Sequence, residues 1–255
     1  MTTSRLALII PAWNEAARLQ DRAFLDFLAR QDVVDLRFVD DGSTDATPAR
    51  LEAIRLQVPD RIVVQRLTQN CGKGEAVRLG LCAALDAGYP LVGYLDADLA
   101  APLDAALLLR DALLTDPALA LALGSRVKLL GWRIRRSERR HYLGRLFATC
   151  ASLTLGLAVY DTQCGAKALR AGPSTDTALA TPFLSRWLFD VELLARLRDA
   201  GAAMREVPLP VWEDPGGSTV TLSDFLRAPL ELYRIYHRYP PQHSRTEAAS
   251  TVPLA

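Results

Sequence analysis

Short apolar runs alternate with longer segments of helical periodicity along the first half of the chain. Residues 6–10, for example, form an apolar run that stops at Pro11, as is typical of a buried strand. The complete pattern predicts strands over residues 6–10, 35–39, 61–66 and 91–95, and helices over residues 15–29, 46–56, 74–87 and 102–114. Strands that alternate with helices of about a dozen residues imply an α/β fold, with a mostly parallel sheet covered by helices on both faces.

The second half of the chain begins with a different pattern. Between residues 126 and 145 there are eight basic residues and one acidic residue, and an uncharged stretch over 146–160 follows directly. Beyond it, the spacing predicts a helix over 188–200, an edge strand over 203–211 that two prolines interrupt, and an amphipathic helix over 223–237. We expect one globular domain over residues 1–225, a C-terminal amphipathic helix over 226–239 and a disordered tail over 240–255.

Composition and charge exclude several classes of protein. The 255 residues are 50% hydrophobic and 23% charged, which is ordinary for a globular domain, and the formal net charge of +1 gives no field that would attract nucleic acid. The uncharged stretch 146–160 falls short of the roughly 20 apolar residues that span a bilayer. The four cysteines share no Cys-x-x-Cys spacing, which argues against a structural zinc site or a disulfide framework and favours a reducing cytoplasm.

Polar clusters follow three of the predicted strands. They are Pro-Ala-Trp-Asn-Glu over residues 11–15, Asp-Asp-Gly-Ser-Thr-Asp over 40–45 and Asp-Ala-Asp over 96–98. Ligands of an open α/β sheet bind beyond the carboxyl ends of its strands, so these clusters converge on one edge if the strands are parallel. Each cluster taken alone is also consistent with a helix cap. Asp96 and Asp98, two residues apart, can both turn toward one hard cation, and their oxygen ligands suit Mg²⁺ or Mn²⁺ and not zinc.

The same residues carry a family resemblance. The three clusters, together with Asn-Cys-Gly-Lys-Gly over 70–74, resemble in order the signatures of inverting GT-A glycosyltransferases of family 2. Later motifs resemble the polyprenyl-phosphate branch of that family, and within it the dolichyl-phosphate glucosyltransferases; they are Gly-Ser-Arg over 124–126, Asp-Thr-Gln-Cys-Gly-Ala-Lys over 161–167 and Arg-Trp-Leu-Phe-Asp-Val-Glu-Leu over 186–193. The resemblance covers roughly residues 5–225.

The resemblance implies a GT-A fold, a nucleotide-sugar donor, a Mg²⁺ or Mn²⁺ cofactor and a polyprenyl-phosphate acceptor. By the same resemblance the donor is UDP-glucose and the sugar is glucose. The implied site residues are Pro11, Ala12, Glu15, Asp40 and Asp41 in the nucleotide pocket, Lys73 near the base or phosphates, Asp96 on the ribose or metal, Asp98 as a catalytic residue on the metal, Arg126 as a catalytic residue on a phosphate and Asp190 as a catalytic carboxylate. One departure concerns Ala100, where many mannose-transferring relatives have a polar metal ligand.

The basic segment and the uncharged stretch after it bear on the acceptor. Arginines beside an amphipathic stretch suit a helix at an anionic membrane surface, and they suit a lipid phosphate presented there. We therefore expect residues 126–160 to dock on the cytoplasmic face of a membrane, with the protein held peripherally. The alternative is a solvated arginine-rich helix followed by an ordinary core helix.

The chemistry of the acceptor leaves two possibilities open. A phosphate monoester is already an anionic nucleophile at neutral pH, whereas a hydroxyl acceptor needs a positioned base, for which Asp190 is the candidate. Relatives with phosphate acceptors also carry an acid at this position, so Asp190 alone does not decide. The rivals are a family 2 enzyme with a soluble hydroxyl acceptor and, from other classes, a nucleotidyltransferase or a binding module. A nucleotidyltransferase would carry a Gly-rich, basic signature after the first strand, where this chain has residues 11–15.

Overall fold

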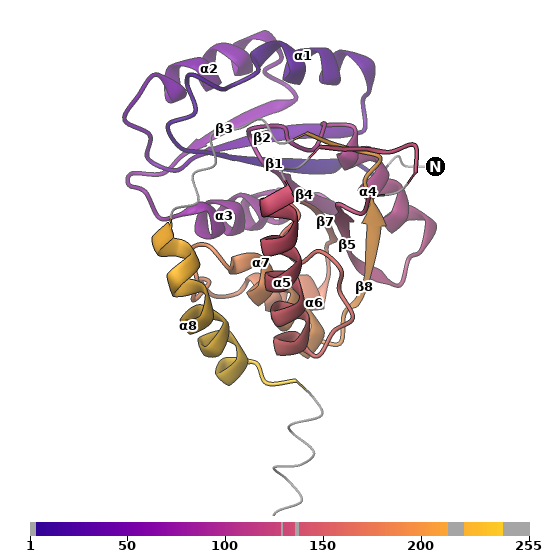
Figure 1. The fold of residues 1–255 in the computed structure, drawn as a ribbon. Coiled ribbons are helices and arrows are strands. Elements are labelled where there is room, and N and C mark those ends of the chain that lie inside the picture. The colour runs from indigo at the N-terminus through magenta and orange to yellow at the C-terminus, as the bar shows by residue number, and fades with distance from the viewer. Residues whose placement is uncertain (1–3, 129, 136–137, 214–221, 242–255) are drawn as a thin grey trace, which may run out of the picture.

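The computed structural model describes residues 4–128, 130–135, 138–213 and 222–241, those at 135, 138–146 and 222–226 by their backbone alone. Its centre is a seven-stranded sheet of order β3-β2-β1-β4-β7-β5-β8 (Figure 1). The strands are β1 (Leu6–Ala12), β2 (Val34–Asp40), β3 (Ile62–Arg66), β4 (Leu91–Leu95), β5 (Leu119–Ser125), β7 (Ala166–Arg170) and β8 (Ala203–Pro208). β7 runs antiparallel to both of its neighbours, whereas the other pairs are parallel. A second small sheet pairs β6 (Arg133–Arg135) with β9 (Val211–Glu213).

Helices cover both faces of the large sheet (Figure 1). They are α1 (Asp21–Arg30), α2 (Thr47–Gln57), α3 (Lys73–Asp86), α4 (Ala105–Thr115), α5 (Glu138–Leu155), α6 (Pro173–Leu179), α7 (Phe189–Asp199) and α8 (Leu222–Arg238). One core contains Phe24 of α1, Leu51 of α2 and Leu109 of α4, and the other contains Val77 of α3 and Leu193 of α7. The expected α/β fold, with a mostly parallel sheet between two helical layers, is confirmed.

Differences from the expectation include two strands of the large sheet and the start of one helix. β5 and β7 were not predicted, because their sequences Leu-Ala-Leu-Ala-Leu-Gly-Ser and Ala-Lys-Ala-Leu-Arg lack the β-branched residues that mark strands. The predicted helix over 15–29 begins late, at Asp21. The carbonyl of Glu15 instead accepts hydrogen bonds from the backbone N–H of Arg18 (2.8 Å) and of Leu19 (2.9 Å), which closes a turn. The predicted edge strand is confirmed as β8, which ends at Pro208.

The uncharged stretch and the last helix contribute to the core. On α5, Ala151 and Leu155 are fully buried, while Leu153 on the other side is exposed. On α8, Leu232 and Ile235 lie in the same hydrophobic cluster as α5 and α7. The expected boundary at residue 225 therefore falls inside a helix that packs on the domain, and the expected tail lies outside the described residues from 242 onward. In the described part of the chain, none of the helices is both long and apolar enough to cross a bilayer.

Near the amino end of β2, Asp35 connects the segments that lead into β1, β3 and β4. Its carboxylate accepts hydrogen bonds from Arg5 Nε (2.9 Å), Arg61 Nε (3.1 Å) and the Tyr89 hydroxyl (2.9 Å). Burial alone would raise the pKa of Asp35, but these three hydrogen bonds outweigh it and lower the pKa below its usual value.

Candidate active site

The carboxyl ends of β1, β2 and β4 meet at one edge of the sheet. Ala12 lies opposite Asp40 in the β1–β2 pair, and Ile9 lies opposite Tyr94 in the β1–β4 pair. Because β7 is antiparallel, its first residue, Ala166, pairs with Leu95 and lies at this same edge. The three polar clusters therefore converge as expected, and residues 161–165 in front of β7 join them.

The loops after β1 and β2 are joined by reciprocal hydrogen bonds. The backbone N–H of Asn14 donates to Ser43 Oγ (2.9 Å), and the backbone N–H of Thr44 donates to Asn14 Oδ1 (2.9 Å). The backbone N–H of Glu15 donates to the buried Thr47 Oγ1 (2.8 Å). These bonds fix the two clusters as one wall of the site.

Asp41 fastens a third loop onto this wall. Its buried carboxylate accepts the backbone N–H groups of Cys71 (2.7 Å) and Gly72 (2.8 Å). Burial raises the pKa of Asp41 above its usual value, although these two hydrogen bonds oppose the shift. Gly72 has a φ of 94°, a left-handed conformation that favours glycine. Asp41 thus positions the start of α3, which carries Lys73.

The other residues expected in the nucleotide pocket differ in how they lie. Asp40 is fully buried; its Oδ1 accepts the backbone N–H of Ser43 (3.0 Å) and its Oδ2 lies 3.3 Å from Arg66 Nε. Ala12 is buried and its carbonyl accepts the backbone N–H of Asp41 (2.9 Å), while the neighbouring Pro11 is half-buried. The carboxylate of Asp40 thus has internal partners, and Pro11 and Ala12 contribute backbone and shape.

Glu15 has an ion pair of its own. Its Oε1 lies 2.6 Å from Arg18 Nη2, and its Oε2 accepts a hydrogen bond from Arg18 Nε (2.9 Å). Burial raises the pKa of Glu15 against the opposing effect of Arg18, and the nearby Asp98 raises it further. The carboxylates of the first and third clusters are therefore close enough to repel one another.

Asp96, Asp98 and Lys73 form the charged centre of the site. Lys73 Nζ lies 2.6 Å from Asp96 Oδ1, and Asp98 Oδ1 accepts the backbone N–H of Ala100 (3.0 Å). Burial and the adjacent Asp96 raise the pKa of Asp98. Burial alone would lower the pKa of Lys73, but Asp96 and other nearby carboxylates outweigh it and raise the pKa. Lys73 is therefore a firmly protonated cation beside two carboxylates.

The residues at this centre fit a divalent cation. Asp96 and Asp98 offer only carboxylate oxygens, and beyond its ion pair with Lys73 the buried Asp96 Oδ1 accepts no hydrogen bond from the described residues. A Cβ on Gly165 would lie 2.2 Å from Asp96 Oδ2, so glycine there leaves the carboxylate its space. The described residues contain no group of three or more His, Cys, Asp or Glu side chains arranged to hold a metal. This is a partial ligand set, of the kind Mg²⁺ completes with substrate phosphates and water.

Asp190 lies in the first turn of α7 with two partners. Its Oδ1 is 2.5 Å from the ammonium of Lys167 and also accepts the hydroxyl proton of Tyr94. All three side chains are buried, and Lys167 Nζ donates to the carbonyl of Cys164 as well (2.8 Å). Burial and the adjacent carboxylate raise the pKa of Tyr94 well above its usual value. Asp190 is thus held in place by a cation and by a neutral phenol.

Arg126 follows β5 and makes a two-pronged ion pair. Its Nε and Nη2 lie 2.5 and 2.6 Å from the two carboxylate oxygens of Asp161, and its backbone N–H donates to the same group (3.1 Å). The guanidinium also stacks over the Trp212 ring at 4.8 Å. Burial alone would lower the pKa of Arg126, but Asp161 outweighs it and raises the pKa. The arginine is therefore permanently charged and rigidly oriented, with Nε and Nη2 both directed at the Asp161 carboxylate.

Comparison with known proteins assigns the family. The model described as Glycosyl transferase family 2 matches residues 7–172, which run from the second residue of β1 to just beyond the end of β7. The chain belongs to glycosyl transferase family 2. This family 2 glycosyltransferase is 31% identical to the dolichyl-phosphate beta-glucosyltransferase of Mus musculus, over 93% of this chain and 76% of that protein. It is also 31% identical to the polyprenol monophosphomannose synthase of Mycolicibacterium smegmatis, over 83% of this chain and 78% of that protein.

A solved structure supports the fold of this family 2 glycosyltransferase. Glucosyl-3-phosphoglycerate synthase from Mycobacterium tuberculosis, in complex with Mn²⁺, UDP and glucosyl-3-phosphoglycerate, matches with a TM-score of 0.69. The two chains are 21% identical, and the match covers 93% of this chain and 81% of that one. The expected GT-A type of fold is thereby confirmed.

Several residues of this glycosyltransferase site were missed as functional candidates. Asp161 and Lys167 lie at the two ends of the motif over 161–167, and they hold Arg126 and Asp190 in place. Arg186, before α7, donates to the side-chain oxygen of Asn70 and ties the loop before α7 to the Lys73 loop. Their presence in family motifs was the available signal, whereas their partners are 23 to 116 residues away in sequence.

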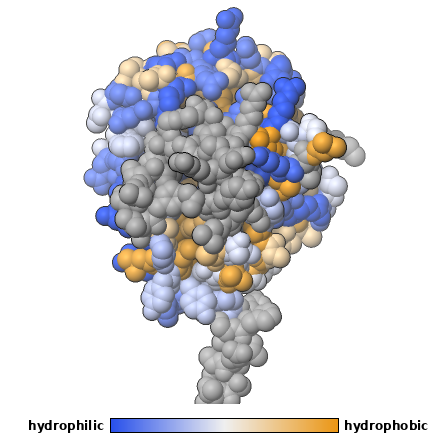
Figure 2. Space-filling view, viewed as in Figure 1, coloured by the Kyte–Doolittle hydropathy of each residue, from blue (hydrophilic) through white to orange (hydrophobic). Residues whose placement is uncertain are grey.

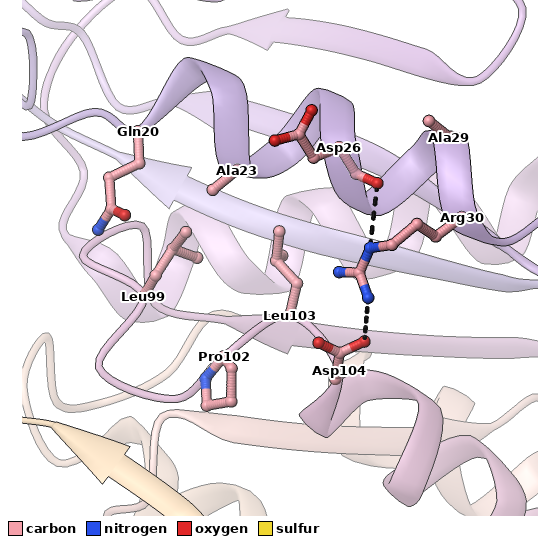
Figure 3. Close-up of a pocket in the computed structure, with 9 residues that line it drawn as sticks. All are labelled: Gln20, Ala23, Asp26, Ala29, Arg30, Leu99, Pro102, Leu103 and Asp104. Atoms are coloured by element: carbon pink, nitrogen blue, oxygen red, sulfur yellow. Dashed lines mark hydrogen bonds and ion pairs between the residues drawn. The ribbon is translucent and has the colours of Figure 1, made fainter.

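A cavity of about 670 Å³ lies beside the site of this glycosyltransferase, between α1 and the segment leading into α4. In Figure 3, Arg30 spans it by donating to the backbone oxygen of Asp26 (3.2 Å) and to the carboxylate of Asp104 (3.4 Å). At the other end, Gln20 Nε2 lies 3.5 Å from the backbone oxygen of Asp98. The cavity therefore touches the backbone that supports Asp98, while the expected site residues lie outside its lining.

Proposed function

We propose that this enzyme transfers glucose from UDP-glucose to a polyprenyl phosphate, with inversion and with Mg²⁺ or Mn²⁺ as its cofactor. The observation that carries the proposal is the extent of the likeness. The similarity to the dolichyl-phosphate beta-glucosyltransferase covers 93% of this chain, so it includes the second half beyond the family model. That half contributes Asp190, in the first turn of α7, to the site.

The first half of the chain supplies the donor site. Asp41 and the loop it fastens, together with Pro11, Ala12 and Glu15, form the proposed uridine pocket, and Asp40 supports it from behind. Lys73 contributes charge for the diphosphate, and Asp96 and Asp98 hold the cation. When bound, that cation offsets the negative charge that develops on the departing UDP. The solved neighbour with Mn²⁺ and UDP is consistent with this assignment.

The proposed phosphate acceptor needs no base from the protein, unlike a hydroxyl acceptor. A hydroxyl acceptor would need a general base, for which Asp190 is the candidate, and Asp190 Oδ1 accepts hydrogen bonds from Lys167 and Tyr94. A phosphate monoester needs no such base, because it is anionic at neutral pH. We assign Asp190 and Lys167 to electrostatic orientation of the acceptor, and Arg126, whose guanidinium is paired with Asp161, to a fixed positive charge near the acceptor phosphate.

The proposal places the enzyme peripherally on the cytoplasmic face of a membrane, where residues 126–160 dock on anionic lipid. The side chains at 135 and 138–146 lie outside the described residues. Support comes from the outer face of α8, where Tyr233 is 60% exposed and Leu230 is 52% exposed, with Arg234 exposed beside them. Tyrosine and arginine around an apolar centre suit the bilayer interface. In Figure 2 the lower part of the molecule, where α5 and α8 lie, mixes hydrophobic with hydrophilic residues, while the α1–α2 end is mainly hydrophilic.

Flotation with anionic vesicles tests the membrane part. At low salt the wild type should float with the vesicles, and a Leu230→Ser, Tyr233→Ser double variant should float several-fold less. Leu56→Ser on α2, which removes an even more exposed leucine (64%) from the distant end of the molecule, should float like the wild type. Equal flotation of all three proteins would show that α8 is not part of the docking surface.

Product analysis tests the reaction itself. The purified enzyme is incubated with UDP-glucose, GDP-mannose or UDP-galactose, with Mg²⁺ or Mn²⁺, and with a short polyprenyl phosphate or 3-phosphoglycerate. Mass spectrometry should detect glucosyl polyprenyl phosphate as the main product. Faster glycosylation of 3-phosphoglycerate would instead favour a soluble hydroxyl acceptor, and faster use of GDP-mannose would overturn the donor assignment.

A further inference from the structure

Lys73 links the two halves of the donor site. Its backbone begins α3 directly after Gly72, whose N–H group is held by Asp41. Its side chain extends to Asp96, so that Nζ lies 2.6 Å from Asp96 Oδ1 and 5.9 Å from the centre of the Phe189 ring. The loop is therefore fixed at its base, and the flexible four-carbon stem carries the charge to the carboxylate pair.

The ion pair with Lys73 occupies the Asp96 carboxylate, which the proposed function needs as a ligand of the divalent cation. Asp96 is one of two carboxylates that fit a divalent cation, and its Oδ1 faces the ammonium instead. The Lys73 side chain is 42% exposed, so its ammonium can move into solvent, although Asp96 Oδ1 itself is buried. An ammonium and a divalent cation on the same oxygen repel each other, and so they bind there in competition.

We propose that Lys73 is the internal counter-ion of Asp96 in the donor-free enzyme and that a divalent cation must displace its ammonium from that carboxylate. The displaced ammonium is then available to the diphosphate of the donor. This arrangement keeps the metal affinity of the free enzyme low and makes metal and nucleotide bind as a pair. It rests on the metal dependence within the proposed function and not on the identity of the acceptor.

Removing the ammonium should therefore change two affinities in opposite directions. In Lys73→Met, the affinity for Mn²⁺ without nucleotide should rise on the order of tenfold, as expected for loss of one nearby unit charge. The affinity for UDP at saturating Mn²⁺ should fall by a similar factor, because a phosphate ligand is lost. Lys73→Arg keeps the charge and should bind Mn²⁺ within about twofold of wild type.

Arg205→Met is a matched control. Arg205 forms a surface ion pair of the same length with Asp116 (2.6 Å), its side chain is 48% exposed, and it lies on β8 away from the site. Its loss changes the net charge of the chain by the same amount. It should leave both affinities unchanged. Electron paramagnetic resonance of free Mn²⁺ measures the metal affinity and calorimetry measures UDP, and circular dichroism checks that each variant is folded.

The Mn²⁺ affinities of the variants decide whether the proposal holds. Tighter Mn²⁺ binding by Lys73→Met alone supports the proposal. Unchanged or weaker Mn²⁺ binding by Lys73→Met would overturn it, as would the same gain in Arg205→Met. Failure of every protein to bind Mn²⁺ at millimolar concentrations would also overturn it, since the ammonium would then compete with nothing. None of these readouts involves glycosyl transfer, so a wrong acceptor in the proposed function leaves the result intact.

Discussion

Replacing Gly165 by alanine tests how closely Asp96 is held. A Cβ at this position would lie 2.2 Å from Asp96 Oδ2, 2.4 Å from Cγ and 2.6 Å from Oδ1. Carbon atoms in ordinary contact lie about 3.5–4.0 Å apart, so the carboxylate must retreat by more than about 1 Å. The backbone can stay in place, because the Asp96 N–H donates to the carbonyl of residue 165 and not to its side chain.

The magnitude follows from this displacement. A shift of about 1 Å in a group that orients the reacting centre costs on the order of a hundredfold in rate. The same shift breaks the ion pair with Lys73, but that pair is partly exposed and contributes at most about 1 kcal/mol. We therefore expect Gly165→Ala to lower kcat about a hundredfold and to weaken Mn²⁺ binding in the presence of UDP. The free energy of unfolding should change by no more than about 1 kcal/mol.

Gly88→Ala is a control in which stability should fall while kcat stays unchanged. Gly88 has a φ of 83° in the turn between α3 and β4, and a Cβ there would meet no atom within 4 Å. Alanine in this left-handed conformation costs about 1–2 kcal/mol, but the turn lies at the far end of β4 from the site. This variant should lose stability in urea unfolding and keep its kcat. Wild-type kcat and Mn²⁺ affinity in Gly165→Ala would refute the idea that the space at residue 165 positions Asp96.

Three further predictions concern other parts of the molecule. Asp41→Ala leaves two backbone N–H groups without their acceptor, so the affinity for UDP in calorimetry should fall at least about tenfold and urea unfolding should show a loss of about 2–3 kcal/mol. Arg126→Lys keeps the charge but not the fork on Asp161, so kcat should fall about tenfold while UDP affinity stays the same; equal losses in both would contradict this. Because the folded pKa of Asp35 is lowered, its stabilising contribution is fully present well above pH 3.8 and declines as pH falls through and below that value. Urea unfolding of wild type and Asp35→Asn should therefore differ most near neutral pH and converge in acid.

The half of the site formed by β1, β2 and β4 could be predicted from the sequence. Apolar runs locate those strands, and the polar residues directly after each run must lie at one edge once the strands are parallel. Asp41 and Asp96 were found in this way because strand, turn and acid are contiguous in the chain. The partner of Asp41 was not found, since a carboxylate that accepts backbone N–H groups 30 residues away leaves no mark in the local pattern.

The other half depends on tertiary contacts that periodicity does not encode. β7 is antiparallel and carries the fully buried Lys167, a residue that strand patterns place at the surface. Arg126 was expected to reach a phosphate, but the structure gives its fork to Asp161, 35 residues further along the chain. The family resemblance indicated that Arg126 and Asp190 matter, whereas the geometry of their partners came only from the folded chain.

The strand order also has a consequence for how the chain is made. β4 is complete at residue 95, but β7, its neighbour on one side, ends at residue 170. At roughly 5–20 residues per second, that edge of β4 waits several seconds on the ribosome for its partner. β5 emerges in the meantime and pairs with β7 and β8, both of which are synthesised later. Nascent chains from which residues 91–95 have emerged but residues 166–170 have not thus expose an apolar strand edge, and at this stage we expect chaperone binding and aggregation to be greatest.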